Sequence, residues 1–400
     1  MKKIKIKELI KQVRGVSYKP EDLHNGLNED SVILLRANNI DDGKINFDDV
    51  VYVDKSKVSE EQYLRKGDIV ICASSGSKNL VGKAARVEFD RQCTFGAFCK
   101  VVRPNSGEDE YLGIYFQSPI YRRKISEVAI GANINNIRNE HIDELDIPVY
   151  LAEERINIIK KIKLIQDIIE QKKQELYALD ELIKARFVEM FGDPIKNPKG
   201  WKVATIGDVV TEARYGTSKP AVEGGKYPYI RMNNITSDGH LDLNDLKYID
   251  IPDDEIEKCV VRKGDVLFNR TNSVELVGKT AFFDLPQDMV IAGYIIRLRL
   301  SEKMLPEVLV QYMNLEALKK ILRSMAKGAV NQANINAQEL QSIKLYIPDM
   351  DLQKQFIEMK GQIDKSKVLS ETHIFYAEKS ITPTTPEIFL KGRCIYGNEF

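Results

Sequence analysis

The sequence predicts a mixed α/β protein with two homologous domains, each followed by a long helix. An internal repeat with a period of about 196 residues indicates the duplication, because self-similarity at one offset marks repeated structural units. Hairpin and strand patterns inside each copy indicate a mainly antiparallel sheet. Heptad spacing of isoleucine and leucine after the first copy indicates a coiled coil.

The duplication rests on short matches that occur in the same order in both halves. The matching pairs are Arg36–Ile40 with Arg231–Ile235, Arg65–Val70 with Arg262–Leu267, Val81–Lys83 with Val277–Lys279, and Ile147–Pro148 with Ile347–Pro348. One register stays open, because Asn334–Ile335 matches both Asn133–Ile134 and Asn136–Ile137.

Local patterns predict the elements inside each copy. Asp-Gly between apolar residues favours a tight hairpin, and it occurs at Asp42–Gly43 and at Asp238–Gly239. Short apolar runs at Asp68–Ala73 and Asp265–Phe268 predict buried strands. Apolar residues at helical spacing predict a helix over Leu309–Met325.

The segment after the first copy has a different pattern. Ala152–Met190 contains no proline or glycine, and its apolar residues alternate at steps of four and three, with Lys172 breaking the seam. Gly192 and Pro194 predict its end. A shorter partner helix is expected at Asp351–Lys379. The expected division is 1–150 and 193–349 for the domains, 151–192 and 350–380 for the helices, and 381–400 for an irregular tail.

Composition restricts the class of protein. With 400 residues, 43% hydrophobic and 30% charged, the chain is typical of a soluble globular protein without a membrane span. Five cysteines without a C-x-x-C pair predict reduced thiols and a cytoplasmic location. Lys+Arg and Asp+Glu both total 59, so the charge balance gives no support to nucleic-acid binding.

Motifs for catalysis are missing from the sequence. The four histidines form no His-Glu-x-x-His pair, and no G-x-G-x-x-G motif is present. Gly278-Lys279-Thr280 resembles the end of a phosphate loop, but Ser273 stands where that motif needs glycine. We therefore expect no enzyme activity, no metal site and no cofactor in this chain.

Polar clusters at matching places in the two copies are the candidate DNA-binding residues. Arginine can pair with guanine, and asparagine or glutamine can pair with adenine. The hydroxyl groups of serine and threonine can bond to either base, and lysine suits phosphates. The candidates before the hairpin are Arg36, Asn38, Asn39, Arg231, Asn233 and Asn234. Those after the buried strand are Ser74, Ser75, Ser77, Lys78, Asn269, Arg270, Thr271, Asn272 and Ser273. Asn331 and Gln332 come from the glycine-opened loops, and Lys83 and Lys279 are the candidate phosphate contacts.

A structural role is the competing interpretation for each of these residues. Asparagine and serine also close turns and cap helices. Asn336 with Glu339, for example, fits a helix N-cap with its capping-box partner.

The chain resembles the specificity subunits of Type I restriction-modification systems. The resemblance spans about residues 1–375, and its motifs are Gly264–Asn272, Val277–Lys279, Gly328 with Asn334–Ile335, Ile347–Pro348 and Leu179–Pro194. The second helix departs from the first, because it lacks a Phe-Gly-Asp-Pro end.

This resemblance implies a function without catalysis. Two target-recognition domains would each read half of a bipartite DNA site, separated by a long antiparallel two-helix coiled coil. The expected partners are double-stranded DNA, two methyltransferase subunits that use S-adenosylmethionine, and endonuclease/translocase subunits that use ATP and Mg. The expected location is the cytoplasm of a bacterium or archaeon. The alternatives are a cytosolic coiled-coil scaffold with protein-binding domains, and DNA recognition for another methylation-based defence system.

Overall fold

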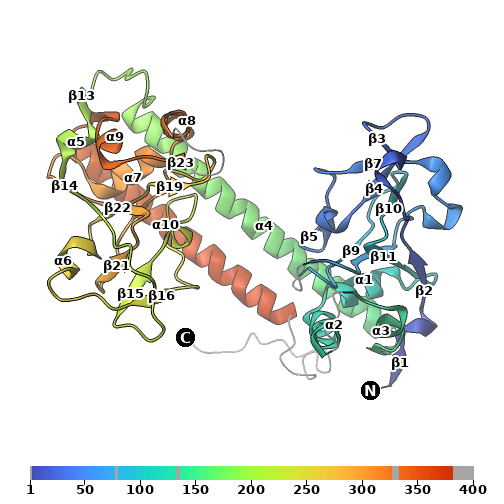
Figure 1. Cartoon of the computed structure of the whole chain (residues 1–400). Coiled ribbons are helices and arrows are strands. Elements are labelled where there is room, and N and C mark those ends of the chain that lie inside the picture. The colour runs from blue at the N-terminus through green and yellow to red at the C-terminus, as the bar shows by residue number, and fades with distance from the viewer. Residues whose placement is uncertain (1, 77–79, 132–135, 327–332, 382–400) are drawn as a thin grey trace. The chain divides into compact units, whose positions relative to one another are not determined.

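The computed structural model describes residues 2–76, 80–131, 136–326 and 333–381. The chain forms two compact units: Gln174–Glu371, here the second unit, and the chain on either side of it, the first unit. Each unit contains one copy of the repeat (Figure 1).

The first copy consists of two four-stranded sheets, two two-stranded ladders and three α-helices. One sheet has the order β10 (Cys93–Phe95), β4 (Ser31–Leu35), β7 (Val51–Asp54), β3 (Leu23–His24). The other has the order β2 (Ile10–Arg14), β11 (Cys99–Pro104), β8 (Ile69–Cys72), β9 (Ala84–Arg86). The ladders pair β1 (Lys3–Lys5) with β12 (Asp146–Pro148) and β5 (Ile40–Asp41) with β6 (Lys44–Ile45). The helices are α1 (Asp109–Gln117), α2 (Pro119–Gly131) and α3 (Asn139–Asp143).

The second copy repeats most of these strand pairings, but the fourth strand of one sheet lies at the opposite edge. Its sheets have the orders β14 (Val210–Tyr215), β22 (Ile295–Leu300), β18 (Val266–Asn269), β20 (Thr280–Phe282), and β16 (Lys247–Ile249), β15 (Tyr227–Ile230), β21 (Met289–Ile291), β17 (Val260–Val261). The ladders are β13 (Lys202–Thr205) with β24 (Lys344–Ile347), and β19 (Thr271–Asn272) with β23 (Ala333–Asn334). The helices are α5 (Ile206–Val209), α6 (Ile256–Cys259), α7 (Pro306–Asn314), α8 (Glu316–Met325) and α9 (Ala337–Gln341).

The predicted mixed α/β class with mainly antiparallel sheets is confirmed. Only β10–β4 and β15–β21 pair in parallel among the strand pairs of the described residues. Of the two predicted Asp-Gly hairpins, the one in the first copy forms between β5 and β6, and Asp42 and Gly43 both have positive φ, at 43° and 74°. Two successive positive φ angles are the geometry of a type I′ turn. At Asp238–Gly239 only the glycine has positive φ, at 94°, and an isolated bridge between Ile235 and Leu241 takes the place of the ladder.

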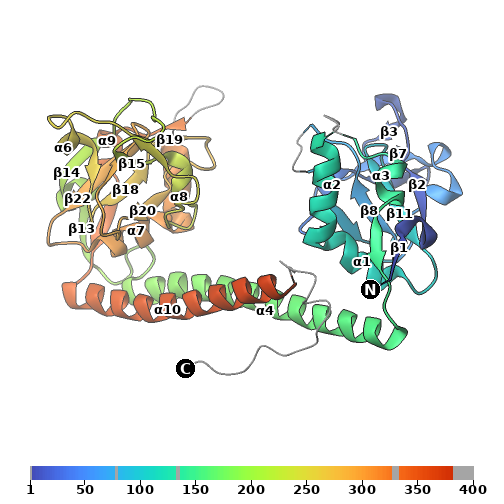
Figure 2. The same cartoon turned by 90° about the horizontal axis from the view of Figure 1, so that it is seen from below.

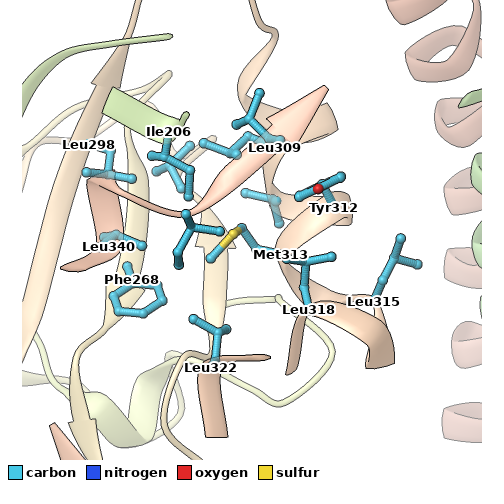
Figure 3. Packing of buried hydrophobic residues seen from close by; sticks show 14 of the residues in the cluster. Ile206, Phe268, Leu298, Leu309, Tyr312, Met313, Leu315, Leu318, Leu322 and Leu340 are labelled. Carbon is cyan, nitrogen blue, oxygen red and sulfur yellow. The ribbon is translucent and has the colours of Figure 1, made fainter. Parts of the chain in front are cut away.

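The helix predicted over Leu309–Met325 is divided in two. Leu315 lies between α7 and α8 with an extended backbone, at φ −65° and ψ 141°. The apolar faces of both helices remain buried in one core, which includes Leu309, Met313, Leu318 and Leu322 (Figure 3). The helical spacing of apolar residues therefore predicted the buried face but not the break.

Backbone pairing resolves the register that the sequence left open. Ser74 bridges Asn136 in the first copy, and Thr271 pairs with Asn334 in the second. The amide of Ile137 donates to the carbonyl of Ala73, as the amide of Ile335 donates to that of Arg270. Asn136–Ile137 is therefore the counterpart of Asn334–Ile335.

Two long helices complete the chain: α4 (Ala152–Phe191, 40 residues) and α10 (Met350–Ile381, 32 residues). The C-terminal half of α4 and α10 lie side by side within the second unit (Figures 1 and 2). Phe187 and Phe191 contact Phe356, while Lys367 pairs with Asp180 at 2.5 Å. Because residue numbers rise along one helix as they fall along its partner, the pair is antiparallel, as predicted.

The N-terminal half of α4 packs on the first copy. Ile159 lies against that copy's apolar core, and Arg155 Nη1 lies 2.5 Å from Glu108 Oε2. The heptad pattern predicted the buried side of α4, but the covering surface here is an α/β domain. Nowhere in the described ranges is there a helix with the length and apolar character needed to cross a membrane.

The buried thiols give a first testable prediction. Burial raises the pKa values of Cys93 and Cys99 to about 12. Since the thiolate is the reactive form, both residues should resist iodoacetamide at pH 8 in the folded protein and react once urea unfolds it. Mass spectrometry of the two peptides measures this. Equal labelling before and after unfolding would contradict the burial.

Candidate nucleic-acid interface

The polar cluster before the hairpin forms the same structural turn in both copies. The Arg36 guanidinium donates to a carboxylate oxygen of Asp49 at 2.8 Å, and Arg231 donates to Asp245 at 2.8 Å. The hydrogen bond from Arg231, together with Lys247, holds the pKa of Asp245 below its usual value. Both arginines are thus partly engaged within their own copy.

The asparagines of this cluster divide into buried and exposed pairs. Asn39 and Asn234 are 0% and 2% exposed, and each accepts a hydrogen bond from the backbone amide of the preceding arginine. The turn uses these two side chains, so they are unavailable to bases in this conformation, contrary to prediction. Asn38 and Asn233 are exposed, although Asn38 also donates to Asp49 at 2.8 Å.

The two predicted phosphate contacts lie beside this turn. Lys83 Nζ is 3.6 Å from an Asp41 carboxylate oxygen, and Lys279 Nζ donates to the Met232 carbonyl at 2.9 Å. Burial lowers the pKa of Lys279. Both lysines are half-buried and must leave these partners, or share them, to bind a phosphate.

The cluster after the buried strand lies at the end of β8 in the first copy and of β18 in the second. Ser74 and Ser75 are half-buried, as are Arg270, Asn272 and Ser273. The Arg270 guanidinium lies 4.9 Å from the centre of the Tyr215 ring, and Tyr215 accepts a hydrogen bond from the Ala337 amide. Stacking of this kind orients the planar guanidinium for paired hydrogen bonds.

In the second copy, the end of the glycine-opened loop pairs through its backbone with the cluster after the buried strand. Thr271, only 7% exposed, donates to the Asn334 side chain at 3.3 Å across the β19–β23 ladder. Asn272 accepts from the Ser273 amide at 2.9 Å. Asn334 and the strand end therefore lie on one surface, although Thr271 itself is mostly covered. Ser77, Lys78, Asn331 and Gln332 lie outside the described residues.

Asn269 does not have the predicted place on this surface. Its side chain is 0% exposed, and neither of its amide atoms has a hydrogen-bond partner among the protein atoms. The backbone contacts of Asn269 to Lys279 and Gly278 match those of Cys72 to Lys83 and Gly82. Asn269 is thus the counterpart of Cys72 and not of Ser74, whose counterpart is Thr271.

Sequence reasoning missed other exposed residues near these clusters. Phe98 and Tyr294 are 70% and 49% exposed at matching places in the two copies. Arg123 on α2 and Lys320 on α8 are exposed cations, also at matching places. The repeat offset itself carried this signal, because each pair recurs about 196 residues apart.

Residues 198–374 match the Type I restriction modification DNA specificity domain. The EcoKI specificity subunit of Escherichia coli (strain K12), a Type I restriction enzyme subunit, is 32% identical over 401 residues, covering 95% of this chain and 85% of the relative. The chain belongs to the family of Type I restriction enzyme specificity subunits.

Two further similarities agree with this membership. The StySPI specificity subunit of Salmonella potsdam is 29% identical over 95% of this chain and 85% of its own length. A solved chain of a type I restriction-modification system shares the fold, with a TM-score of 0.57 at 17% identity over 97% of both chains. DNA sequence recognition is accordingly the function of this specificity subunit, and a protein-binding scaffold is not favoured.

Proposed function

We propose that each copy of the repeat reads one half of a bipartite, asymmetric DNA site. The observation that supports this is that both copies have the same backbone hydrogen bonds at the strand end but carry different side chains there. The structural counterparts of Ala73, Ser74 and Ser75 are Arg270, Thr271 and Asn272, held by equivalent backbone hydrogen bonds. Two domains that present different side chains from the same backbone support would recognise two different sequences.

The chemistry of the two surfaces differs accordingly. Arg270 and Asn272 suit paired hydrogen bonds to guanine and adenine in the major groove, where every base pair has a distinct pattern. The hydroxyl groups of Ser74 and Ser75 can form hydrogen bonds with either guanine or adenine. We expect the second copy to read the half-site that depends more on a guanine.

The partner subunits complete the proposal. Two methyltransferase subunits with S-adenosylmethionine and endonuclease/translocase subunits with ATP and Mg would act beside this chain in the cytoplasm of a bacterium or archaeon. Exposed apolar side chains on α4, among them Tyr177, Leu182 and Val188, support docking of a partner on the helices. Partners would also supply part of the phosphate contacts, because a chain of net charge 0 has no excess of basic residues.

The subunit alone should neither methylate nor cleave DNA. Within the described ranges, no group of three or more His, Cys, Asp or Glu side chains could hold a metal ion. Purified chain incubated with DNA, S-adenosylmethionine, ATP and Mg should give no product, while addition of the methyltransferase subunits should give methylated DNA. Turnover by the chain alone would contradict the proposal.

Methylome sequencing of cells with and without the gene tests the half-site proposal. One bipartite motif should disappear when the chain is absent. Loss of two unrelated motifs, or of none, would contradict this function.

Replacement of Arg270 by alanine should relax recognition in one half-site only. Loss of a paired contact to a base costs about 1–3 kcal/mol of discrimination. Arg270→Lys should fail as well, because lysine keeps the charge but neither the planar fork nor the stacking on Tyr215. Binding of the methyltransferase complex to site variants measures this.

Lys263 offers a matched control. It is an exposed cation in the turn before β18, at the opposite end of the same strand. Lys263→Ala should leave the discrimination between bases unchanged. Equal weakening of specific and random DNA by Arg270→Ala would identify Arg270 as a general phosphate contact instead.

A further inference from the structure

We propose that Phe98 and Tyr294 are specificity-determining residues, each contacting the 5-methyl group of a thymine in the half-site of its own copy. The inference rests on the proposed half-site function and names a base contact that no polar cluster supplies. Neither aromatic residue belongs to the motifs that the sequence singled out.

Both rings occupy one position in a tight turn. The amide of Cys99 donates to the carbonyl of Gly96 at 2.8 Å, and the amide of Ile295 donates to that of Ala292 at 2.8 Å. Phe98 and Tyr294 immediately precede the residues that close these turns. The turns join β10 to β11 and β21 to β22, so two sheets hold each of them.

Close backbone contacts fix these turns further. A Cβ atom added to Gly15 would lie 2.1 Å from the Gly96 carbonyl oxygen, and one added to Gly216 would lie 2.4 Å from that of Ala292. Such distances are too short for any side chain, so the neighbouring strand touches the turn directly. The aromatic rings therefore project from a rigid support.

The backbone of each aromatic residue is bonded to the strand end that carries the polar readers. The Phe98 carbonyl accepts from the amides of Ala73 and Ser74 at 2.9 and 3.0 Å. The Tyr294 carbonyl accepts from the Arg270 amide at 2.9 Å. Each aromatic residue thus borders Ser74 or Arg270, and a DNA groove that meets one residue meets its neighbour.

The fold gains little from these rings. Phe98 is 70% exposed and Tyr294 is 49% exposed, although burial of an aromatic side chain is favourable. A single exposed apolar side chain is ordinary. Recurrence of an exposed ring at the same turn of both copies, where neighbouring residues change, indicates a shared task instead.

The chemistry of the groove indicates the base. Arginine, asparagine, serine and threonine discriminate bases best in the major groove, and the apolar group exposed there is the thymine methyl group. An aromatic ring next to polar side chains can contact the thymine methyl group while those side chains form hydrogen bonds with the neighbouring base edges.

The experiment uses the complex of this chain with its methyltransferase subunits, bound to duplexes that contain the motif from methylome sequencing. Each thymine of the two half-sites is replaced in turn by deoxyuridine, which removes only the methyl group. For the wild type, one replacement in each half-site should weaken binding. Tyr294→Ala should weaken binding to the unmodified site about 5- to 150-fold and abolish the effect of deoxyuridine in its half-site. Phe98→Ala should do the same for the other half-site.

Two variants serve as controls. Tyr294→Phe keeps the ring and should retain the deoxyuridine effect. Tyr248, on β16 of the same unit, is 44% exposed, and Tyr248→Ala should change nothing. The inference is overturned if no deoxyuridine weakens wild-type binding, or if the alanine variants keep the full effect. Absence of any methylated motif would instead contradict the proposed function itself.

Discussion

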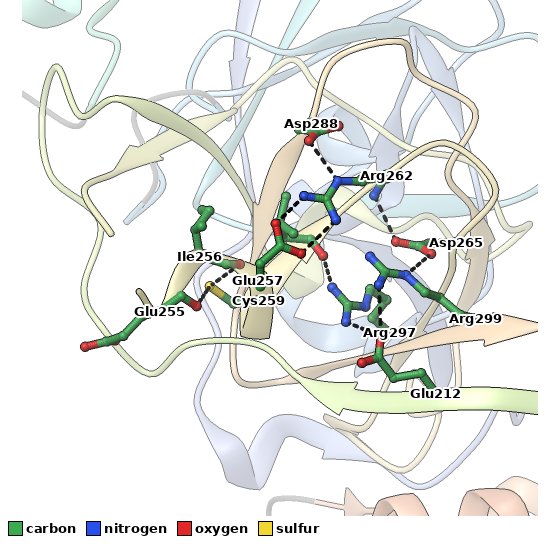
Figure 4. Close-up of polar contacts among 11 residues, drawn as sticks. Glu212, Glu255, Ile256, Glu257, Cys259, Arg262, Asp265, Asp288, Arg297 and Arg299 are labelled. Carbon is green, nitrogen blue, oxygen red and sulfur yellow. Dashed lines mark hydrogen bonds and ion pairs between the residues drawn. The ribbon is translucent and has the colours of Figure 1, made fainter. Parts of the chain in front are cut away.

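Glu212→Ala is expected to lower the free energy of unfolding of the second unit by about 3–5 kcal/mol, because it leaves a buried guanidinium without its counter-ion. Arg297 is 0% exposed, and its Nη2 lies 2.6 Å from Glu212 Oε2. Its Nη1 donates to the Val260 carbonyl. Figure 4 shows Glu212 beside the guanidinium groups of Arg297 and Arg299. Arginine cannot lose its proton at neutral pH, so the charge stays buried when the carboxylate is removed.

The same pair should make the second unit sensitive to acid. Burial alone would raise the pKa of Glu212, but the charges of Arg297, Arg214 and Arg299 outweigh it and lower that pKa. A carboxylate with a lowered folded pKa stabilises the fold above its unfolded pKa, and this stabilisation is lost as pH falls through the folded value. Glu212→Gln should therefore reduce the difference in stability between neutral and acidic pH.

The first copy provides the control. Val101 occupies the place of Arg297, since Val101 pairs with Val70 as Arg297 pairs with Leu267. The double variant Glu212→Gln/Arg297→Val should recover most of the lost stability, because an apolar pair replaces two charges. Urea unfolding followed through the chain's one tryptophan, Trp201 of the second unit, measures each variant. A double variant as unstable as Glu212→Ala would show that the ion pair itself is not responsible.

The sequence predicted those features that depend on local spacing. The Asp-Gly hairpin and the buried side of α4 follow from residues near one another in the chain. The repeat follows from short segments that match about 196 residues apart. Arg297 shows the limit, because its partner Glu212 is distant in sequence and comes from a neighbouring strand. No local pattern reveals that β22 carries a buried charge where β11 carries Val101.

The candidate site was predicted only in part, for a related reason. Asparagine at Asn39 and Asn234 has the residue type expected of both a base reader and a turn brace, and only burial distinguishes these roles. Arg270 stacks on Tyr215, which comes from β14 and is distant in sequence. This support for the guanidinium could therefore not be predicted from the residues around Arg270. The exposed rings of Phe98 and Tyr294 escaped prediction because an aromatic residue after a strand is usually part of the core.

Phe356→Ala should destabilise the second unit by about 3–5 kcal/mol, through lost burial and the cavity left behind. Phe356 is 0% exposed, and its ring centre lies 5.3 Å from that of Phe187 and 5.4 Å from that of Phe191. These contacts link α10 to the end of α4. The indole of Trp201 donates to the Phe191 carbonyl at 2.7 Å, so its fluorescence should report the change.

Phe375 supplies the comparison on the same helix. It is 51% exposed, and Phe375→Ala removes the same ring while leaving no cavity, so stability should change by less than about 0.5 kcal/mol. An equally small effect of Phe356→Ala would contradict the prediction. The contacts between α4 and α10 would then depend on polar pairs such as Lys367 with Asp180 and not on the three aromatic rings. A large loss at Phe356 with none at Phe375 places the energy of the antiparallel pair at the end of α4. The shared apolar core of α4, α10 and the second copy would then fix where this recognition domain sits on its helices.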